Sequence, residues 1–382
     1  MHFQRAKIEN WKNFKSGDVK LSRRLFLVGP NASGKSNFLD LFRFLRDLSL
    51  SKGGGLQQAV ESRNGVSAIR CLAARQNPDV LIEVVMTDND GNEWLYLLRF
   101  NQDKQRIPLI KEERVEKNGR VLLDRPDEDD RKDELRLTQT ALEQTRANRD
   151  FRTIVTFFQS ISYQHLLPQV IRDPQGFSPG QIENDPFGRD FLQRVENTQQ
   201  KTRNSRLNKI LAALKVVVPQ LKELKVTRDH FGTPHLVGLF EHWRPKAGKQ
   251  NEAQFSDGTL RLFGLFWSLF EGEGPLLMEE PELSLHSEVV RRLPSLIERI
   301  NRQRKSKRQY FISTHSEEML SDESISADEV LRLAPSPDGT LLKPPSEDQE
   351  IMAQLNAGLT MADVILPRSA PKSAHQLELL FQ

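Results

Sequence analysis

Eight consecutive residues near the start of the chain have the spacing of a phosphate-binding loop. Residues 29–36 read GPNASGKS and fit the pattern G-x-x-x-x-G-K-[ST] at every fixed position. In such a loop, backbone N–H groups point at anionic phosphates, and glycine lets the backbone approach them closely. We expect Lys35 to place its charge near the β- and γ-phosphates and Ser36 to ligate Mg²⁺. Asn31 and Gly34 complete the residues that we expect to line the nucleotide.

Two adjacent carboxylates follow a short apolar run farther along the chain. Residues 276–278 read LLM, and Glu279 and Glu280 come directly after them. A buried strand that ends in acids is how enzymes with a phosphate loop hold Mg²⁺. We expect Glu279 to hold the metal through water and Glu280 to orient or deprotonate the attacking water. A strand that merely ends in surface acids is the alternative, and the phosphate loop makes it the weaker one.

Two further polar groups stand at the ends of predicted elements. Ser256, Asp257 and Gly258 open an apolar helix, where an anion could bind, although they would also fit an ordinary N-cap. His315 follows a predicted strand at 309–313 and could hydrogen-bond a γ-phosphate. A histidine at a strand end is more often structural. Local sequence alone favours the structural alternative in both places.

The apolar pattern predicts elements that would position these residues. Residues 25–28 form an apolar run that stops at Gly29, and helical periodicity follows up to residue 48. A phosphate loop requires this strand–loop–helix order, which argues against an accidental match in a glycine-rich turn. Turn residues at 88–91 and 118–119 predict hairpins. The loop would therefore join a buried strand to an amphipathic helix.

The rest of the pattern divides the chain into parts. Apolar runs at 151–158 and 161–167 look strand-like, and helices are predicted at 259–270 and at 284–302, the latter kinked at Pro294. The segment at 124–134 is a mixed charge run that predicts a solvated loop. We expect a first ATPase lobe, a helical insertion, a second lobe and a polar, disordered tail at 1–170, 171–222, 223–335 and 336–382.

Composition limits the class of protein. The chain has 382 residues, 37% of them hydrophobic and 28% charged, which excludes a wholly disordered chain. The net charge is only +3, so any nucleic-acid site must be a local patch. A single cysteine, Cys71, excludes an internal disulfide and a cysteine-built zinc site. Without a signal-peptide core or a run of about 20 apolar residues, we expect a cytoplasmic protein without membrane association.

The order of the motifs is more specific than any one of them. A phosphate loop, Ser-x-Gly at a helix start, an apolar strand with paired acids and a strand ending in histidine together resemble an ABC-type ATPase head of the SMC and RecF branch. The opening IENWKNF at 8–14 resembles the first motif of that branch. The sequences EEPELSLH at 279–286 and STHS at 313–316 are similar to those of short AAA-labelled ATPases related to the OLD family. Many of those are bacterial defence or toxin-partner ATPases.

The resemblance implies a fold and further site residues. The fold would be an α/β P-loop NTPase with a mixed β-sheet, helices on both faces, an antiparallel β subdomain and a helical insertion. Ser256 and Gly258 would form the signature that reaches the γ-phosphate of the opposite protomer. Ser284 would lie in the loop that communicates across the dimer. His315 would be the switch histidine, and Lys12 stands where relatives often carry an arginine near the nucleotide.

The resemblance also calls for a glutamine that senses Mg²⁺. Gln159 and Gln164 both follow runs that look strand-like, and Gln159 is preferred. With Ser36 and Glu279, Gln159 completes the expected metal-side residues. The signature itself departs from the transporter version, because it reads Ser-Asp-Gly-Thr.

The resemblance implies an ATPase that uses ATP and Mg²⁺ at the interface of a head-to-head homodimer or higher homo-oligomer. No second catalytic constellation and no toprim pattern appears in the sequence, so a separate effector protein, a nuclease or toxin, is expected in a bacterial anti-phage defence or toxin system. The alternatives are a RecF-like DNA-repair ATPase and a nucleotide-stabilised scaffold with little turnover. A basic run at 299–308 leaves nucleic-acid binding open, although it also fits a solvated helix end.

Overall fold

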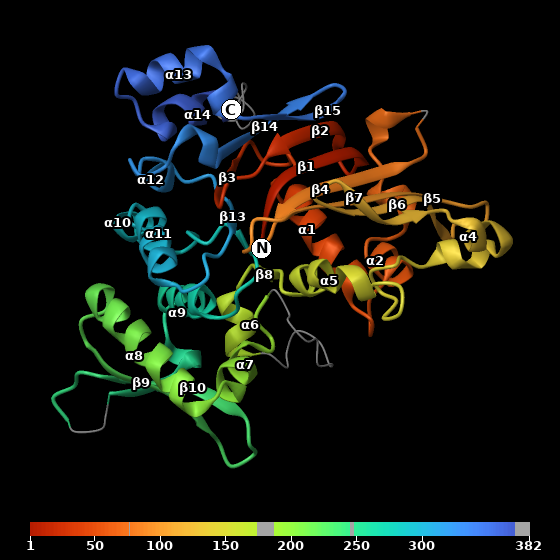
Figure 1. Ribbon diagram of the computed structural model, residues 1–382. Coiled ribbons are helices and arrows are strands. Elements are labelled where there is room, and N and C mark those ends of the chain that lie inside the picture. The colour runs from red at the N-terminus through yellow and green to blue at the C-terminus, as the bar shows by residue number, and fades with distance from the viewer. Residues whose placement is uncertain (76, 174–186, 245–247, 371–382) are drawn as a thin grey trace, which may run out of the picture. The chain divides into compact units, whose positions relative to one another are not determined.

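A computed structural model shows how the chain is organised. It describes residues 1–75, 77–173, 187–244 and 248–370. The chain forms two compact units, whose elements are drawn in Figure 1. The first unit consists of Met1–Ile161, Glu273–Leu277 and Arg304–Gln382. The second consists of Ser162–Gly272 and Met278–Gln303.

An antiparallel sheet fills much of the first unit. Its strands lie in the order β2-β1-β4-β5-β6-β7. They are β1 (His2–Trp11), β2 (Phe14–Lys20), β4 (Val80–Thr87), β5 (Glu93–Gln102), β6 (Pro108–Lys117) and β7 (Arg120–Arg125). Every second residue of β5 is buried, from Trp94 through Tyr96 to Phe100, as expected for a strand with one face on the core. The predicted hairpin turn is confirmed, since Asn118 and Gly119 both have positive φ, 49° and 75°.

A second, mixed sheet carries the phosphate loop. Its strand order is β15-β14-β3-β13-β12-β8. The strands are β3 (Arg24–Val28), β8 (Ser162–Gln164), β12 (Leu276–Glu279), β13 (Tyr310–Ser313), β14 (Val330–Ser336) and β15 (Gly339–Lys343). β3 runs parallel to both β13 and β14, and all five of its residues are buried. The predicted mixed sheet is therefore confirmed, with the strand before the phosphate loop inside it.

Aromatic side chains from helices and strands of the first unit pack together in its core. The ring of Phe3 lies 4.9 Å from those of Phe42 and Phe157, and Phe42 stacks on Phe311 at 4.5 Å. Phe42 belongs to α1 (Lys35–Ser49), and Phe157 belongs to α5 (Arg152–Gln159). Such ring pairs stabilise a core by about 0.5–1.5 kcal/mol each beyond the area that they bury. This cluster holds α1, and with it the end of the phosphate loop, against the sheet.

The strand-like interpretation of residues 151–158 is wrong, because these residues form helix α5. Its buried residues are Ile154, Val155, Phe157 and Phe158. They recur at spacings of one, three and four, which places them on one helical face. Over eight residues an apolar run does not distinguish a buried strand from a short helix.

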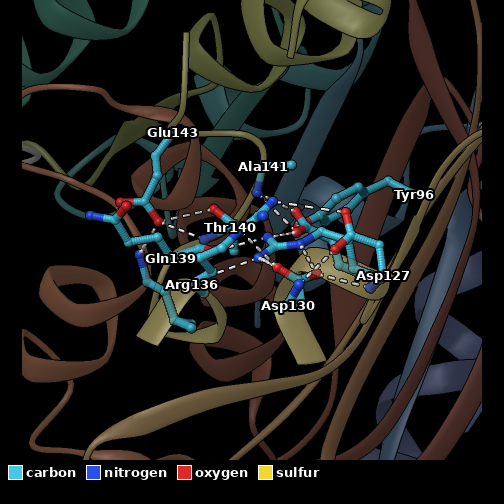
Figure 2. A network of polar contacts seen from close by, with 11 residues as sticks. Tyr96, Asp127, Asp130, Arg136, Gln139, Thr140, Ala141 and Glu143 are labelled. Atoms are coloured by element: carbon cyan, nitrogen blue, oxygen red, sulfur yellow. Dashed lines mark hydrogen bonds and ion pairs between the residues drawn. The ribbon is translucent and has the colours of Figure 1, made fainter. Parts of the chain in front are cut away.

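A buried polar network holds residues 124–134, for which the sequence predicts a solvated loop. The guanidinium of Arg125 donates two hydrogen bonds of 2.9 Å to Asp130 and one of 3.0 Å to Glu113. Glu113 also accepts from the hydroxyl of Tyr96 and from the backbone N–H of Ala141. Figure 2 labels Tyr96, Asp130 and Ala141 among the residues of this network. Glu113 is fully buried, and burial raises the pKa of its carboxyl. The charge run therefore folds back onto the sheet, with α4 (Glu128–Lys132) inside it.

The prediction of a polar, disordered tail is wrong for residues 336–370. These residues contribute β15, α13 (Gln349–Asn356) and α14 (Met361–Ser369), and α14 packs on β14. Ile351, Val364 and Ile365 are buried. A capping box between Thr360 and Asp363 marks the start of α14 and is the signal that could have revealed it. Residues 371–382 lie outside the described residues.

The second unit is largely helical. Its helices are α6 (Pro168–Arg172), α7 (Phe191–Asn197), α8 (Gln200–Val217), α9 (Asp257–Phe270), α10 (Ser287–Val290) and α11 (Leu293–Gln303). A three-stranded sheet has the order β11-β10-β9, from β9 (Leu221–Arg228), β10 (Pro234–Phe240) and β11 (Lys249–Asn251). The helix predicted at 284–302 is divided in two, and Pro294 lies in the first turn of α11, where proline is tolerated.

The first unit also contains α2 (Leu56–Glu61), α3 (Val66–Ile69) and α12 (Glu317–Leu320). In the parts of the chain that the structure describes, no helix combines the length and apolar character needed to cross a membrane.

Candidate nucleotide-binding site

The phosphate loop leaves the buried strand β3 and ends where α1 begins. Gly34 precedes α1 in a left-handed conformation, with φ of 97°, and Ala32 also has a positive φ of 62°. The ammonium of Lys35 donates to the loop's own carbonyls, at 3.0 Å to Gly29 and 3.2 Å to Pro30. A phosphate in the loop would compete with these carbonyls for the ammonium. The predicted strand–loop–helix arrangement is present.

The two other loop residues expected to meet the nucleotide, Asn31 and Ser36, are exposed. Ser36 lies in the first turn of α1, where N–H groups have no partner inside the helix. These orphan donors and the helix dipole favour an anion at this end of α1. The loop therefore offers hydroxyl, ammonium and backbone donors together.

Asn13 supports the loop, and sequence reasoning did not identify it. Its amide donates to the carbonyl of Ser33 at 2.8 Å and to the hydroxyl of Thr340 at 2.7 Å. Thr340 donates to the same Ser33 carbonyl at 2.9 Å, and Asn37 donates to Asn13 at 3.0 Å. A Cβ atom at Gly34 would collide with the amide of Asn13. Asn13 belongs to the opening motif, so its position in the sequence was visible, whereas nothing local pointed to Thr340.

His315 belongs to the strand beside the phosphate loop. β13 pairs with β3 in parallel, with Ser313 opposite Leu27, and the N–H of Thr314 donates to the carbonyl of Leu27 at 3.1 Å. The loop and His315 thus follow the carboxyl ends of neighbouring parallel strands, where ligands bind in open α/β sheets. His315 is exposed. The contact of His315 with a nucleotide stays a prediction.

Lys12 lies in the turn between β1 and β2, with a positive φ of 52°. Its ammonium is 4.0 Å from the carboxylate of Asp40 on α1. Burial lowers the pKa of Lys12, and the charge of Asp40 opposes that shift. In this structure the ammonium faces a carboxylate of α1, five residues beyond Lys35 in the sequence.

The paired acids lie at the end of β12, in the second unit. The carboxylate of Glu279 accepts a hydrogen bond from the hydroxyl of Tyr163, and its backbone carbonyl lies 3.3 Å from Nδ1 of His165. Glu280 has a positive φ of 43°, and so does Ser284, with 63°. Non-glycine residues with such φ values concentrate at functional sites. The backbone turns sharply at both positions that the resemblance singled out.

The predicted signature and the loop around Ser284 meet within the second unit. Ser256 caps α9, and its hydroxyl accepts from the N–H of Thr259 at 3.2 Å. A Cβ atom at Gly258 would lie 2.9 Å from the carbonyl oxygen of Ser284, so glycine is needed for this contact. Arg172 of α6 holds the signature from outside, at 2.5 Å from the carboxylate of Asp257. Ser256 is therefore the N-cap of α9, and this does not conflict with its predicted role in the signature.

Arg261 is a buried cation next to the acids. It lies one turn into α9, is 7% exposed and lines a cavity of about 20 Å³ together with Glu279. Burial lowers the pKa of its guanidinium, and the charges of Asp257, Glu282 and Glu280 oppose that shift. Helix α9 thus places a positive charge near the carboxylates of Glu280 and Glu282, at a cavity that Glu279 also lines.

Gln159 does not occupy the predicted metal-sensing position. It ends α5, and its amide donates to the carbonyl of Ser49 at 2.7 Å. Ser49 is the last residue of α1, whereas Lys35 begins that helix about 20 Å away. The alternative, Gln164, does end a strand, β8, and its amide donates to the carbonyl of Gly264 at 3.3 Å.

The two residues predicted to lie on the metal side carry oxygen donors. Ser36, in the first unit, has a hydroxyl and Glu279, in the second, has a carboxylate, and Mg²⁺ prefers hard oxygen ligands of these kinds. In the described ranges, no group of three or more His, Cys, Asp or Glu side chains could hold a metal ion by itself. Mg²⁺ in phosphoryl-transfer sites typically uses one or two protein ligands together with substrate phosphates and water.

The sequence of this chain matches a known protein family, and its fold is similar to that of solved structures. A family model described as "AAA domain, putative AbiEii toxin, Type IV TA system" matches residues 25–321, more than half of the chain. A search of curated proteins finds no match. A crystal structure of an Smc head bound to the C-winged helix domain of ScpA is 13% identical, with a TM-score of 0.56 over 90% of this chain and 98% of that one.

A second Smc head, with an extended coiled coil and bound to the C-terminal domain of ScpA derived from Pyrococcus furiosus, is 11% identical. Its TM-score is 0.52, over 93% of this chain and 99% of that chain. At these identities the likeness concerns the fold alone. The chain therefore belongs to this AAA-domain family and has the fold of an ABC-type ATPase head of the SMC-like branch.

Proposed function

We propose that this chain binds ATP with Mg²⁺ in the phosphate loop and hydrolyses it when two copies of the head meet. The observation that carries the proposal is the loop itself. Gly34 adopts the left-handed conformation that the turn requires, and Lys35 folds back onto the carbonyls of Gly29 and Pro30. These features, at the N-terminus of a 15-residue helix, form an anion site of the type that holds β- and γ-phosphates.

The residues of the first unit bind and sense the phosphates. Lys35 gives up its contacts with the loop carbonyls and donates to phosphate oxygens instead. Ser36 provides a hydroxyl for the metal side, and Asn31 lines the loop. His315, at the end of the neighbouring strand, hydrogen-bonds the γ-phosphate and thereby distinguishes ATP from ADP.

The acids after β12 perform the hydrolytic part. Glu279 holds Mg²⁺ through water, and Glu280 accepts a proton from the attacking water. When bound, Mg²⁺ neutralises charge on the β- and γ-phosphate oxygens. The strained φ of Glu280 fixes the direction of its backbone at the strand end, which supports a positioned base.

Two heads complete each site in this proposal. Ser256 and Gly258 of one protomer contact the γ-phosphate bound by the other, and Ser284 links the two sites. The packing of Gly258 against the carbonyl of Ser284 supports this coupling, since a shift of one backbone segment moves the other. ATP closes the homodimer and hydrolysis loosens it, which is a population shift driven by ligand affinity.

Two measurements test the ATPase proposal. Equilibrium titration with a fluorescent ATP analogue reports binding, and phosphate release reports turnover. Lys35→Ala should bind the analogue poorly, whereas Lys104→Ala, a change of the same kind in an exposed hairpin turn, should bind normally. Tight binding by Lys35→Ala would contradict the role of the loop.

We also propose that the ATPase controls a separate effector, a nuclease or toxin, in a bacterial defence or toxin system. The description of the matching family supports this context, because it names a toxin and a toxin–antitoxin system. Glu280→Gln protein, trapped with ATP in its native host, should co-purify with a stoichiometric effector protein. Recovery of DNA and no protein would instead favour a repair function.

The basic run contributes less to the DNA-repair alternative than its sequence suggests. Arg308 is 1% exposed and donates to the carbonyl of Gly274, so it is part of the core of the first unit. Arg302 pairs with Glu298 one turn away on α11, at 2.8 Å. Arg308 is therefore withdrawn from the basic surface, whereas the pair between Arg302 and Glu298 lies exposed on α11.

A further inference from the structure

The tyrosine on β8 makes a direct contact with the predicted metal-side carboxylate. The hydroxyl of Tyr163 donates to Oε2 of Glu279, and both side chains are half-buried. Two residues later, just past the end of β8, Nδ1 of His165 lies 3.3 Å from the backbone carbonyl of Glu279. β8 and β12 are neighbours in the sheet, so strand pairing fixes this side-by-side arrangement.

We infer that Tyr163 is a positioning residue for Glu279: its hydroxyl fixes the carboxylate in the orientation that receives the hydrated Mg²⁺ of the bound nucleotide. This inference rests on the proposed function. A carboxylate that holds a metal keeps one oxygen for the metal shell and can accept a hydrogen bond on the other. Such outer partners orient the ligand, and their loss typically weakens metal affinity about 10- to 100-fold.

The surroundings explain why a phenol suits this place. Glu279 and Arg261 both line the small cavity. The Tyr163 hydroxyl gives the carboxylate of Glu279 a directional hydrogen bond there, which a phenylalanine could not make. The contact of His165 with Glu279 is to the backbone carbonyl at the strand end, whereas that of Tyr163 is to the carboxylate.

The test compares two tyrosine-to-phenylalanine variants. Tyr163→Phe removes the hydroxyl beside Glu279 and keeps the ring. Tyr96→Phe is the matched control, because its hydroxyl likewise donates to a glutamate, Glu113, but in the antiparallel sheet that contains none of the acids at the end of β12. Mn²⁺ binding to protein saturated with a non-hydrolysable ATP analogue is measured by electron paramagnetic resonance, and thermal unfolding reports stability.

Tyr163→Phe should bind Mn²⁺ about tenfold more weakly than the wild type, with unchanged affinity for the analogue in the absence of metal. Tyr96→Phe should keep wild-type Mn²⁺ affinity. Equal Mn²⁺ affinity in wild type and Tyr163→Phe, or an equal loss in both variants, would overturn the positioning role. A wild-type protein that binds neither analogue nor Mn²⁺ would instead contradict the proposed ATPase function, so the two failures are distinguishable.

Discussion

The amide of Asn13 occupies the space that a Cβ atom would need at Gly34, and it holds the carbonyl of Ser33 at 2.8 Å. Gly34 has a φ of 97°, a conformation that other residues rarely adopt. The conformation of the phosphate loop therefore depends on the turn between β1 and β2 as well as on the loop's own glycines.

Removal of this support should weaken nucleotide binding. Asn13→Ala removes one of two side-chain donors to the carbonyl of Ser33, and Thr340 remains as the other. One such hydrogen bond contributes about 0.5–1.5 kcal/mol net. We expect ATP affinity to fall by up to about tenfold, as 1.4 kcal/mol corresponds to a factor of ten. Asn101→Ala is the control. It removes a hydrogen bond of 2.8 Å from the amide of Asn101, on β5, to the carboxylate of Asp79, and it should bind ATP normally in the same titration. Unchanged affinity in Asn13→Ala would show that the loop does not depend on this amide.

The contact between Gly258 and Ser284 predicts a defect in assembly and not in ATP binding. Gly258→Ala brings a methyl group to 2.9 Å from the carbonyl of Ser284, closer than packing allows, so one of the two segments must shift. In the proposed mechanism both segments belong to the dimer interface. ATP should still bind to the monomer, while ATP-dependent dimerisation, measured by light scattering, should be lost. A variant that dimerises with wild-type affinity would remove the signature from the proposed interface.

The buried network around Glu113 predicts a large effect on stability alone. Glu113→Gln leaves Arg125 without one of its two buried carboxylate partners. Breaking a buried ion pair from one side typically lowers the free energy of unfolding by about 3–5 kcal/mol. Denaturant unfolding of the variant should show this loss, while ATP affinity at low denaturant stays unchanged. A shift below about 1 kcal/mol would mean that the network contributes little.

A histidine in the three-stranded sheet predicts a dependence of stability on pH. Its hydrogen bond to Glu252 at 2.6 Å, followed by that to Asp229, raises the pKa of His235. A raised pKa in the folded state means that its stabilisation is complete below the unfolded value of about 6.5 and is lost as the pH rises through the folded value. The difference in melting temperature between wild type and His235→Asn should therefore be larger at about pH 5.5 than at about pH 9. The opposite order would contradict the assignment.

The sequence predicts best what depends on neighbouring residues. The phosphate loop, the short strands at 25–28 and 276–278 and the turn at Asn118 are local patterns, and the structure has each of them. Asn13 and Thr340 could not be paired in the same way, because 327 positions separate them and their contact exists only after the sheets have formed.

Two errors have a common physical cause. The run at 151–158 and the segment that forms α14 are short, and both show apolar residues on one helical face only over two turns. Short elements gain their stability from packing and not from intrinsic propensity, so tertiary context decides their form. The same error affects Gln159, because the run before it forms helix α5 and not a strand. Gln159 ends that helix, and its amide contacts the carbonyl of Ser49.

The most direct test of the proposed mechanism is the rate of ATP hydrolysis by Glu280→Gln compared with that of the wild type, measured together with ATP binding and oligomeric state. The variant should bind ATP, hardly hydrolyse it and accumulate as a closed dimer, because the glutamine amide cannot accept the proton of the attacking water. An unchanged rate of hydrolysis in Glu280→Gln would contradict the assignment of the catalytic base and with it the proposed mechanism.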